Sequence, residues 1–202
     1  MTVQLGERQA GFDTRKLGFP SVDGCMAIVA VLPEGLYGYH SFGGERDTDW
    51  PRIIPQFKAF IEGKGGDLAK ATRLYGITHV SKRGWSLGVR KERWKEELKA
   101  YYDDLGLSCR ISGYNLDDGV AGGFHKKDKS AYVEFEKFGS KCDVSVQSWD
   151  TVTYTRQKAA QNPWGDDIKS IQGGKLVAVQ GDIFDPVTAK ALKKISKTAL
   201  KS

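Results

Sequence analysis

Apolar residues occur in short runs along this chain, and glycine-rich or polar turns separate one run from the next. A continuous small-apolar run, residues 25–32, is followed by the turn-forming sequence Pro33-Glu34-Gly35 and then by residues 36–42. This pattern predicts two strands joined by a tight connection. Over residues 53–62 the apolar residues recur at helical spacing and are followed by Gly63. We therefore expect a helix there.

The same pattern predicts a mixed fold over the next hundred residues. Residues 72–80 are β-rich, and residues 89–105 place apolar side chains on one face of a longer helix. Three further strands are expected after it, the last two joined as a hairpin at residues 139–141: residues 108–116, 130–138 and 142–155. This order predicts an α+β protein with a layered, β-sandwich-like sheet core flanked by helices.

The composition changes after residue 156, which suggests a domain boundary. Residues 1–156 are expected to form one domain, and residues 157–202 a C-terminal extension packed on the same body. The extension begins with a polar, turn-rich segment and continues with an expected strand at residues 176–184. From Pro186 to about residue 200 the spacing predicts a lysine-rich helix.

Composition and charge narrow the class of protein. Of 202 residues, 40% are hydrophobic, which is enough for a sizeable core. The net charge is +6, but five lysines without an acidic residue lie beyond residue 185, leaving 26 basic and 25 acidic side chains in residues 1–185. A nearly neutral body gives no reason to expect nucleic acid as a partner. The lysine-rich tail is expected to be a solvated helix, or else to bind an acidic partner or an anionic membrane surface.

Cysteine usage and hydropathy exclude several further classes. The three cysteines have no paired spacing, so neither a disulfide framework nor a structural zinc site is expected. No apolar run is long enough for a secretory signal or a membrane span. We expect a soluble protein without a Sec-type signal.

The most informative chemistry is a cysteine at the start of one predicted strand and a histidine at the end of the next. Cys25 would act as a nucleophile and His40 as the base that takes its proton. Gly24 would leave room for a substrate, and backbone N–H groups at the turn would hold an oxyanion. A simple hairpin would place Cys25 opposite Gly43, about three residues from His40, so either a bulge at Gly38 or a Cys25 outside the strand is needed. The alternative is a buried, inert cysteine.

Other candidate residues are weaker. Trp50 follows the loop after His40 and is a candidate for lining a cleft. His79 and His125 are expected to be exposed or hydrogen-bonded histidines without a catalytic role, and Cys109 and Cys142 to be buried in strands. The carboxylates of Asp117 and Asp118 are adjacent in sequence, but no third ligand is evident, and we expect no metal site.

A resemblance strengthens the catalytic interpretation. Gly24-Cys25 before a small-apolar strand, followed by Gly-x-x-x-x-His over residues 35–40, resembles the active-site segment of the cysteine-dependent glutamine deamidases. These include the catalytic domain of cytotoxic necrotizing factor, the Burkholderia lethal factor and the chemoreceptor glutamine deamidase. The similarity extends over about residues 16–147 and is specific only at Cys25 and His40.

The resemblance implies a deamidase-like fold and an activity. The protein would convert a glutamine side chain of a target protein to glutamate through a thioester on Cys25, with His40 as base, no cofactor, and a possible transglutaminase side activity. The chemoreceptor enzymes have a threonine six residues before the cysteine, whereas this chain has Phe19. A main-chain carbonyl near Phe19, or the Ser21 hydroxyl, is therefore expected to orient His40.

The interval of 15 residues between Cys25 and His40 is closer to the toxins, which favours a bacterial effector or toxin involved in virulence. Such a protein would be cytoplasmic or exported into a host or target cell by a signal-independent route. The alternatives are a chemoreceptor-type deamidase and a non-catalytic protein-binding module of the same fold. An activated Cys25 should react with iodoacetamide well below about pH 8.5, the region of an ordinary thiol, whereas a structural cysteine should not.

Overall fold

The computed structural model describes residues 3–83, 93–118 and 130–148, together with five later strand segments. Its centre is a seven-stranded sheet in the order β12-β11-β2-β5-β4-β6-β7. In that order the strands are β12 (Lys175–Leu176), β11 (Lys169–Gln172), β2 (Gln9–Asp13), β5 (Leu36–Ser41), β4 (Met26–Val31), β6 (Arg73–Thr78) and β7 (Arg110–Asn115). Every residue of β4 and β5 is buried, because both faces of the sheet are covered.

A second sheet covers one of these faces. Its order is β1-β3-β8-β9-β14. The strands are β1 (Val3–Gln4), β3 (Lys16–Val22), β8 (Ala131–Phe138), β9 (Lys141–Ser148) and β14 (Lys193–Lys194). A separate antiparallel pair consists of β10 (Thr153–Lys158) and β13 (Asp182–Thr188).

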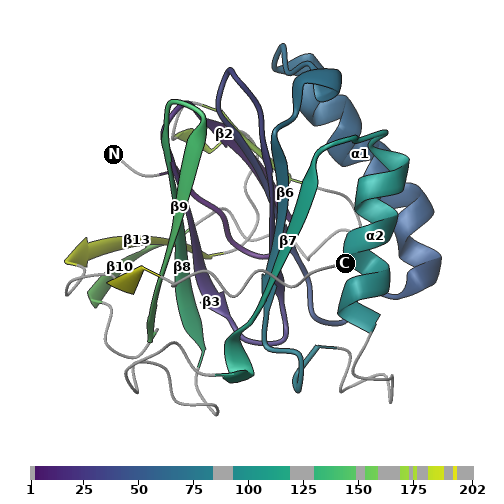
Figure 1. Cartoon of the computed structure of the whole chain (residues 1–202). Coiled ribbons are helices and arrows are strands. Elements are labelled where there is room, and N and C mark those ends of the chain that lie inside the picture. The colour runs from purple at the N-terminus through teal and green to yellow at the C-terminus, as the bar shows by residue number, and fades with distance from the viewer. Residues whose placement is uncertain are drawn as a thin grey trace.

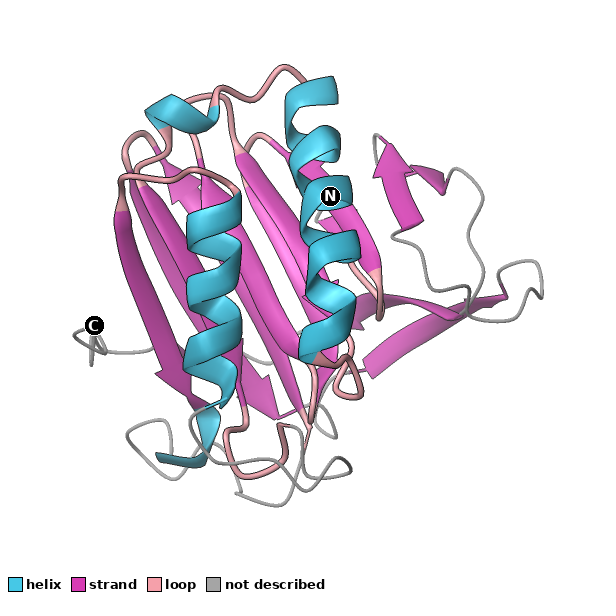
Figure 2. Ribbon diagram, turned by 90° about the vertical axis from the view of Figure 1, so that its right-hand side faces the viewer, coloured by secondary structure: helices cyan, strands magenta, loops and turns pink. Residues whose placement is uncertain are grey.

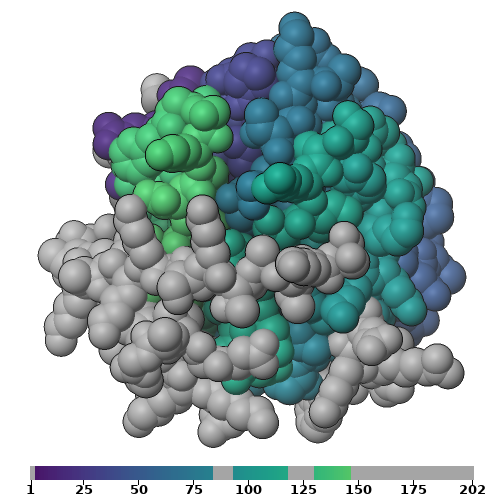
Figure 3. Space-filling view, viewed as in Figure 1, coloured from purple at the N-terminus to yellow at the C-terminus, as the bar shows by residue number. Residues whose placement is uncertain are grey.

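Two helices cover the opposite face of the seven-stranded sheet, α1 (Trp50–Gly63) and α2 (Arg93–Asp104) (Figures 1 and 2). Short 3-10 helices occur at Asp47–Asp49, Leu68–Lys70 and Leu116–Asp118. The space-filling view shows the green β8–β9 hairpin and the teal α2 region on opposite sides of the molecule (Figure 3). The described part of the chain is thus a sandwich of two sheets with a helical layer outside one of them.

Alternation along β4 divides the core into two parts. Ala27, Val29 and Val31 pack between the sheets, where Phe19 and Phe135 also lie. The intervening residues of β4 face the helices and pack in a second cluster with side chains that include Ile54, Phe57 and Tyr101. Successive side chains of a strand point to opposite faces, so one apolar strand serves both clusters.

The α+β class predicted from the sequence is confirmed. The helix expected at residues 53–62 is α1, which begins earlier, with Pro51 in its first turn, where proline is favoured. The segment expected as one strand at residues 142–155 is two strands, β9 and β10. The three N-terminal strands were not predicted, because β1 has only two residues and glycine or proline interrupts the others.

The prediction of a lysine-rich helix from Pro186 is wrong in the part of this segment that the structure describes. Pro186 to Thr188 belong to β13, which pairs with β10, and Lys193–Lys194 form β14, which pairs with β9. Val187 and Thr188 are β-branched and favour a strand, and the pairing overrides the helical spacing of the apolar residues. The other residues of the expected helix lie outside the described residues.

The boundary expected at residue 156 falls within β10. Beyond it, β11 pairs with β2 and β14 pairs with β9, so strands of the C-terminal extension join both sheets of the body. In the described part of the chain, none of the helices combines the length and apolar character needed to cross a membrane.

Candidate active site

Cys25 lies immediately before β4, and His40 lies in β5, the strand paired with β4. β4 and β5 pair regularly, with Met26 opposite Ser41 and Ala27 opposite His40. Besides burial, the charges of Glu7 and Arg83 shift the pKa of both Cys25 and His40, so the two side chains share these charged neighbours. Of the two arrangements expected from the sequence, the structure has a cysteine outside the strand and no bulge at Gly38.

Gly38 has a different role, in sheet packing. A Cβ atom there would lie 2.8 Å from side-chain carbons of Leu5, Leu17 and Phe19. The glycine allows the two sheets to approach closely next to His40.

Glycines also bring the Cys25 and His40 segments together. A Cβ atom on Gly43 would lie 2.9 Å from the carbonyl carbon and oxygen of Gly24. One on Gly24 would lie 3.3 Å from the Lys82 carbonyl oxygen. The space beside Gly24, expected to admit a substrate, is therefore occupied by the turn that follows β6.

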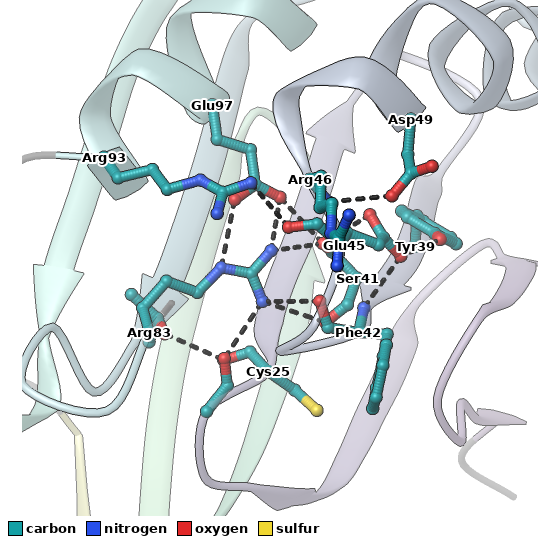
Figure 4. A network of polar contacts seen from close by, with 12 residues as sticks. Cys25, Tyr39, Ser41, Phe42, Glu45, Arg46, Asp49, Arg83, Arg93 and Glu97 are labelled. Carbon is teal, nitrogen blue, oxygen red and sulfur yellow. Dashed lines mark hydrogen bonds and ion pairs between the residues drawn. The ribbon is translucent and has the colours of Figure 1, made fainter. Parts of the chain in front are cut away.

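The Arg83 side chain connects the Cys25 and His40 segments by hydrogen bonds (Figure 4). Its Nη1 donates to the carbonyl oxygens of Gly24 at 3.0 Å, Phe42 at 3.0 Å and Ser41 at 3.3 Å. Its Nε donates to Glu97 Oε2 at 3.0 Å, and its Nη2 pairs with Glu97 Oε1. Both side chains are buried, with 3% and 0% of their surface exposed. A buried ion pair between Arg83, in the turn after β6, and Glu97, on α2, thus holds the backbone on either side of the candidate site.

A second buried carboxylate extends this network. Ser41 Oγ lies 2.7 Å from Glu97 Oε1 and 3.0 Å from Glu45 Oε2, and Glu45 Oε1 accepts the Tyr39 hydroxyl at 2.6 Å. Burial, and then the negative charge of Glu97, raise the pKa of Glu45. Arg83 is thus the cation on which two buried carboxylates converge.

The imidazole of His40 is fully buried and oriented by a main-chain carbonyl. Its Nδ1 lies 2.6 Å from the Leu5 carbonyl oxygen, which only accepts, so Nδ1 carries the hydrogen. Its Nε2 has no hydrogen-bond partner in the described part of the chain. Burial lowers the pKa of His40, which keeps the ring neutral. The result is an Nε2 lone pair available as a base.

The carbonyl that orients His40 differs from the one expected. Phe19 contributes its ring, which meets the imidazole edge to face at 5.8 Å, and its carbonyl makes no hydrogen bond to His40. Ser21 lies at the register shift in β3, with a positive φ of 57°, and makes no hydrogen bond to His40 among the described residues. Leu5 directly follows β1, and its N–H donates to Gly18 at 2.8 Å. A two-residue strand leaves no periodic signal in the sequence, so this partner was missed.

The thiol of Cys25 is bound to a carboxylate that the sequence analysis did not identify. Its Sγ donates to Glu7 Oε1 at 3.1 Å, and only 4% of the residue is exposed. Burial, then the negative charge of Glu7 and the hydrogen bond to it, raise the pKa of Cys25 well above its ordinary value. Arg83 and the Gly43 N–H act in the opposite direction.

The raised pKa favours the thiol form of Cys25 in this state over the thiolate that an activated cysteine would carry. Within the described residues no hydrogen bond joins Cys25 to His40. Glu7 belongs to the turn that also carries Arg8, whose N–H donates to the His40 carbonyl at 2.7 Å. One N-terminal turn thus reaches both candidate catalytic residues.

The remaining candidates make other side-chain contacts, although His79 directly follows Thr78, whose hydroxyl donates to the Cys25 carbonyl at 2.8 Å. Trp50 packs with the helix-side cluster, under the guanidinium of Arg93, whereas His40 packs between the sheets. His79 Nδ1 lies 3.2 Å from Asp117 Oδ1, which also accepts the Ser81 hydroxyl at 2.8 Å. Asp117 is thus engaged by neighbouring side chains.

Cys109 and Cys142, expected to be buried in strands, are partly buried and unbridged; Cys142 lies in β9, whereas Cys109 lies just before β7. His125 and the side chain of Asp118 lie outside the described residues.

A scan against protein-family models and a search of curated proteins give no match to this chain. The functional argument therefore rests on the chemistry of the site.

Proposed function

We propose that this protein is a cysteine-dependent protein-glutamine deamidase that acts as a bacterial effector or toxin. The observations that support this proposal concern His40: its Nδ1 is held by a main-chain carbonyl, its Nε2 is buried without a partner in the described part of the chain, and it shares the charged neighbours Glu7 and Arg83 with Cys25. Nucleophilic catalysis by a cysteine requires an oriented imidazole with one nitrogen available to take the thiol proton.

The reaction begins with exchange of a hydrogen bond. The Cys25 thiol turns from Glu7 Oε1 to His40 Nε2, which takes its proton, and Arg83 supports the resulting thiolate by its positive charge. The sulfur attacks the glutamine carboxamide carbon, and the carbonyl electron pair moves to oxygen. The Gly43 N–H, which faces the sulfur, is the candidate donor for this oxyanion.

Two bonds then break in turn. When the oxyanion collapses, the C–N bond breaks and the His40 imidazolium gives its proton to the leaving nitrogen, which departs as ammonia. The thioester is hydrolysed by water, from which His40 again takes a proton. The C–S bond breaks, glutamate forms, and the proton returns to the Cys25 sulfur.

The proposal is tested by mass spectrometry of candidate target proteins after incubation with the purified protein. Deamidation adds about one mass unit to a glutamine and releases ammonia. We expect Cys25→Ala and Cys25→Ser to abolish this change while remaining folded, and Cys109→Ala, a partly buried cysteine on the far end of the sheet from the site, to retain it. Glutamine conversion by the Cys25→Ala protein would contradict the assignment of the nucleophile.

A further inference from the structure

We propose that Glu7 is a specificity-determining residue that makes the site select a carboxamide and reject a carboxylate. The inference rests on the proposed deamidase function and adds to it the basis on which substrate and product are distinguished.

The position of Glu7 is fixed by the turn that carries it. The Gly6 N–H donates to Gln9 Oε1 at 2.7 Å, and the Arg8 N–H donates to the His40 carbonyl at 2.7 Å. The guanidinium of Arg8 lies over the Phe42 ring, 4.9 Å from its centre. The turn is therefore attached to the end of β5 next to the site, and the Glu7 carboxylate lies against the Cys25 sulfur.

A carboxylate in this position needs a hydrogen-bond donor. Ionised glutamate only accepts hydrogen bonds, and in the resting state its donor is the Cys25 thiol. When the thiol proton passes to His40, Oε1 loses that donor. The amide nitrogen of a glutamine side chain carries two N–H groups and replaces it. Glu7 therefore binds the substrate on the side of the leaving nitrogen.

The product of the reaction offers no such donor. A glutamate side chain at Cys25 would bring a second carboxylate against Glu7, and two like charges at close range in a buried site repel strongly. The same residue that binds the amide thus expels the acid. This gives the site preference for an amide and speeds product release.

Two small electrophiles of nearly equal size test this directly. Iodoacetamide carries a carboxamide and iodoacetate a carboxylate, and both alkylate a thiolate. The rates of alkylation of Cys25 in the full chain are measured by mass spectrometry of the peptide that contains it. We expect the ratio of the iodoacetamide rate to the iodoacetate rate to fall at least tenfold in Glu7→Gln. It should stay unchanged in the control Glu34→Gln, an exposed glutamate in the turn between β4 and β5.

A second variant keeps the test valid if Glu7→Gln folds poorly. Glu7→Asp retains the charge and should keep the ratio within about threefold of the parent. The corresponding measurement with peptides is inhibition by the glutamate product, which should strengthen at least tenfold in Glu7→Gln. An unchanged ratio in Glu7→Gln, or an equally reduced ratio in Glu7→Asp, would overturn the inference.

Failure of the proposed function gives a different result. If the parent protein converts no glutamine but its alkylation ratio responds to Glu7→Gln, the deamidase proposal is refuted while Glu7 still selects against carboxylates. If the parent converts glutamine and the ratio does not respond, the role of Glu7 alone is refuted.

Discussion

Replacing Arg83 by methionine should be the most damaging single change near the candidate site that leaves Cys25 and His40 in place. The methionine keeps most of the side-chain length but removes the cation and all six hydrogen bonds that the guanidinium donates. Glu97, with 0% of its side chain exposed, would become an unpaired buried charge. Removing one partner of a buried ion pair costs about 3–5 kcal/mol.

The backbone contacts add to this cost. Three carbonyl groups, those of Gly24, Ser41 and Phe42, lose their Arg83 donor. Each buried group left unsatisfied costs about 1–3 kcal/mol, although neighbouring groups and water recover part of it. We expect a loss of at least about 4 kcal/mol in the free energy of unfolding, a large part of the roughly 5–15 kcal/mol available to a domain.

Urea denaturation followed by tryptophan fluorescence measures this loss. The double variant Arg83→Met/Glu97→Leu removes the unpaired buried charge of Glu97. It should recover at least about 2 kcal/mol in the free energy of unfolding relative to Arg83→Met. Lys99→Met is the matched control, because it breaks an ion pair with Asp103 whose side chains are 68% and 52% exposed. That change should cost less than about 1 kcal/mol. A cost below about 1.5 kcal/mol for Arg83→Met, or a double variant less stable than the single one, would refute the reasoning.

Two further predictions concern the same site. Gly43→Ala should lower the free energy of unfolding by about 1–3 kcal/mol and slow deamidation, because its Cβ would meet the Gly24 peptide. The control Gly63→Ala meets nothing within 4 Å and should change stability by less than about 1 kcal/mol. Thermal melting of both variants measures the difference. Burial lowers the pKa of His40, so the unfolded chain binds more protons and stability falls as pH drops below about 6.5. His40→Gln should reduce this fall in urea titrations at about pH 7.5 and 5.5, and equal falls in both proteins would contradict the assignment.

The sequence is informative where contacts follow from local pattern. The apolar run before Pro33 predicts β4 almost to the residue, because a strand buried on both faces is continuously apolar, and the turn at Pro33-Glu34-Gly35 predicts the start of β5. The resulting hairpin has Cys25 just before its first strand and His40 near the end of its second.

The rest of the site depends on contacts between distant segments. Leu5 and Glu7 reach His40 and Cys25 from a turn whose sequence has no periodicity. Arg83 and Glu97 resemble surface charges in the sequence, and only the packing of α2 against the sheet shows that they are buried. The C-terminal helix was predicted from spacing alone, and strand pairing with β9 and β10 overrides that spacing.

The pairing of β3 with β8 determines when this protein can fold during synthesis. Leu17 lies beside Phe135 in that pairing, so the layer that covers His40 cannot form until the ribosome has made β8. More than a hundred residues lie between the two strands, and the ribosome adds about 5–20 residues per second, so roughly 5–20 seconds pass between the synthesis of β3 and that of β8. During this interval β4, which directly follows Cys25, lacks its covering sheet, and the thiol is open to oxidation and to mispairing with other thiols. Cellular reductants and holding chaperones should therefore influence the yield of folded protein more than its final stability does.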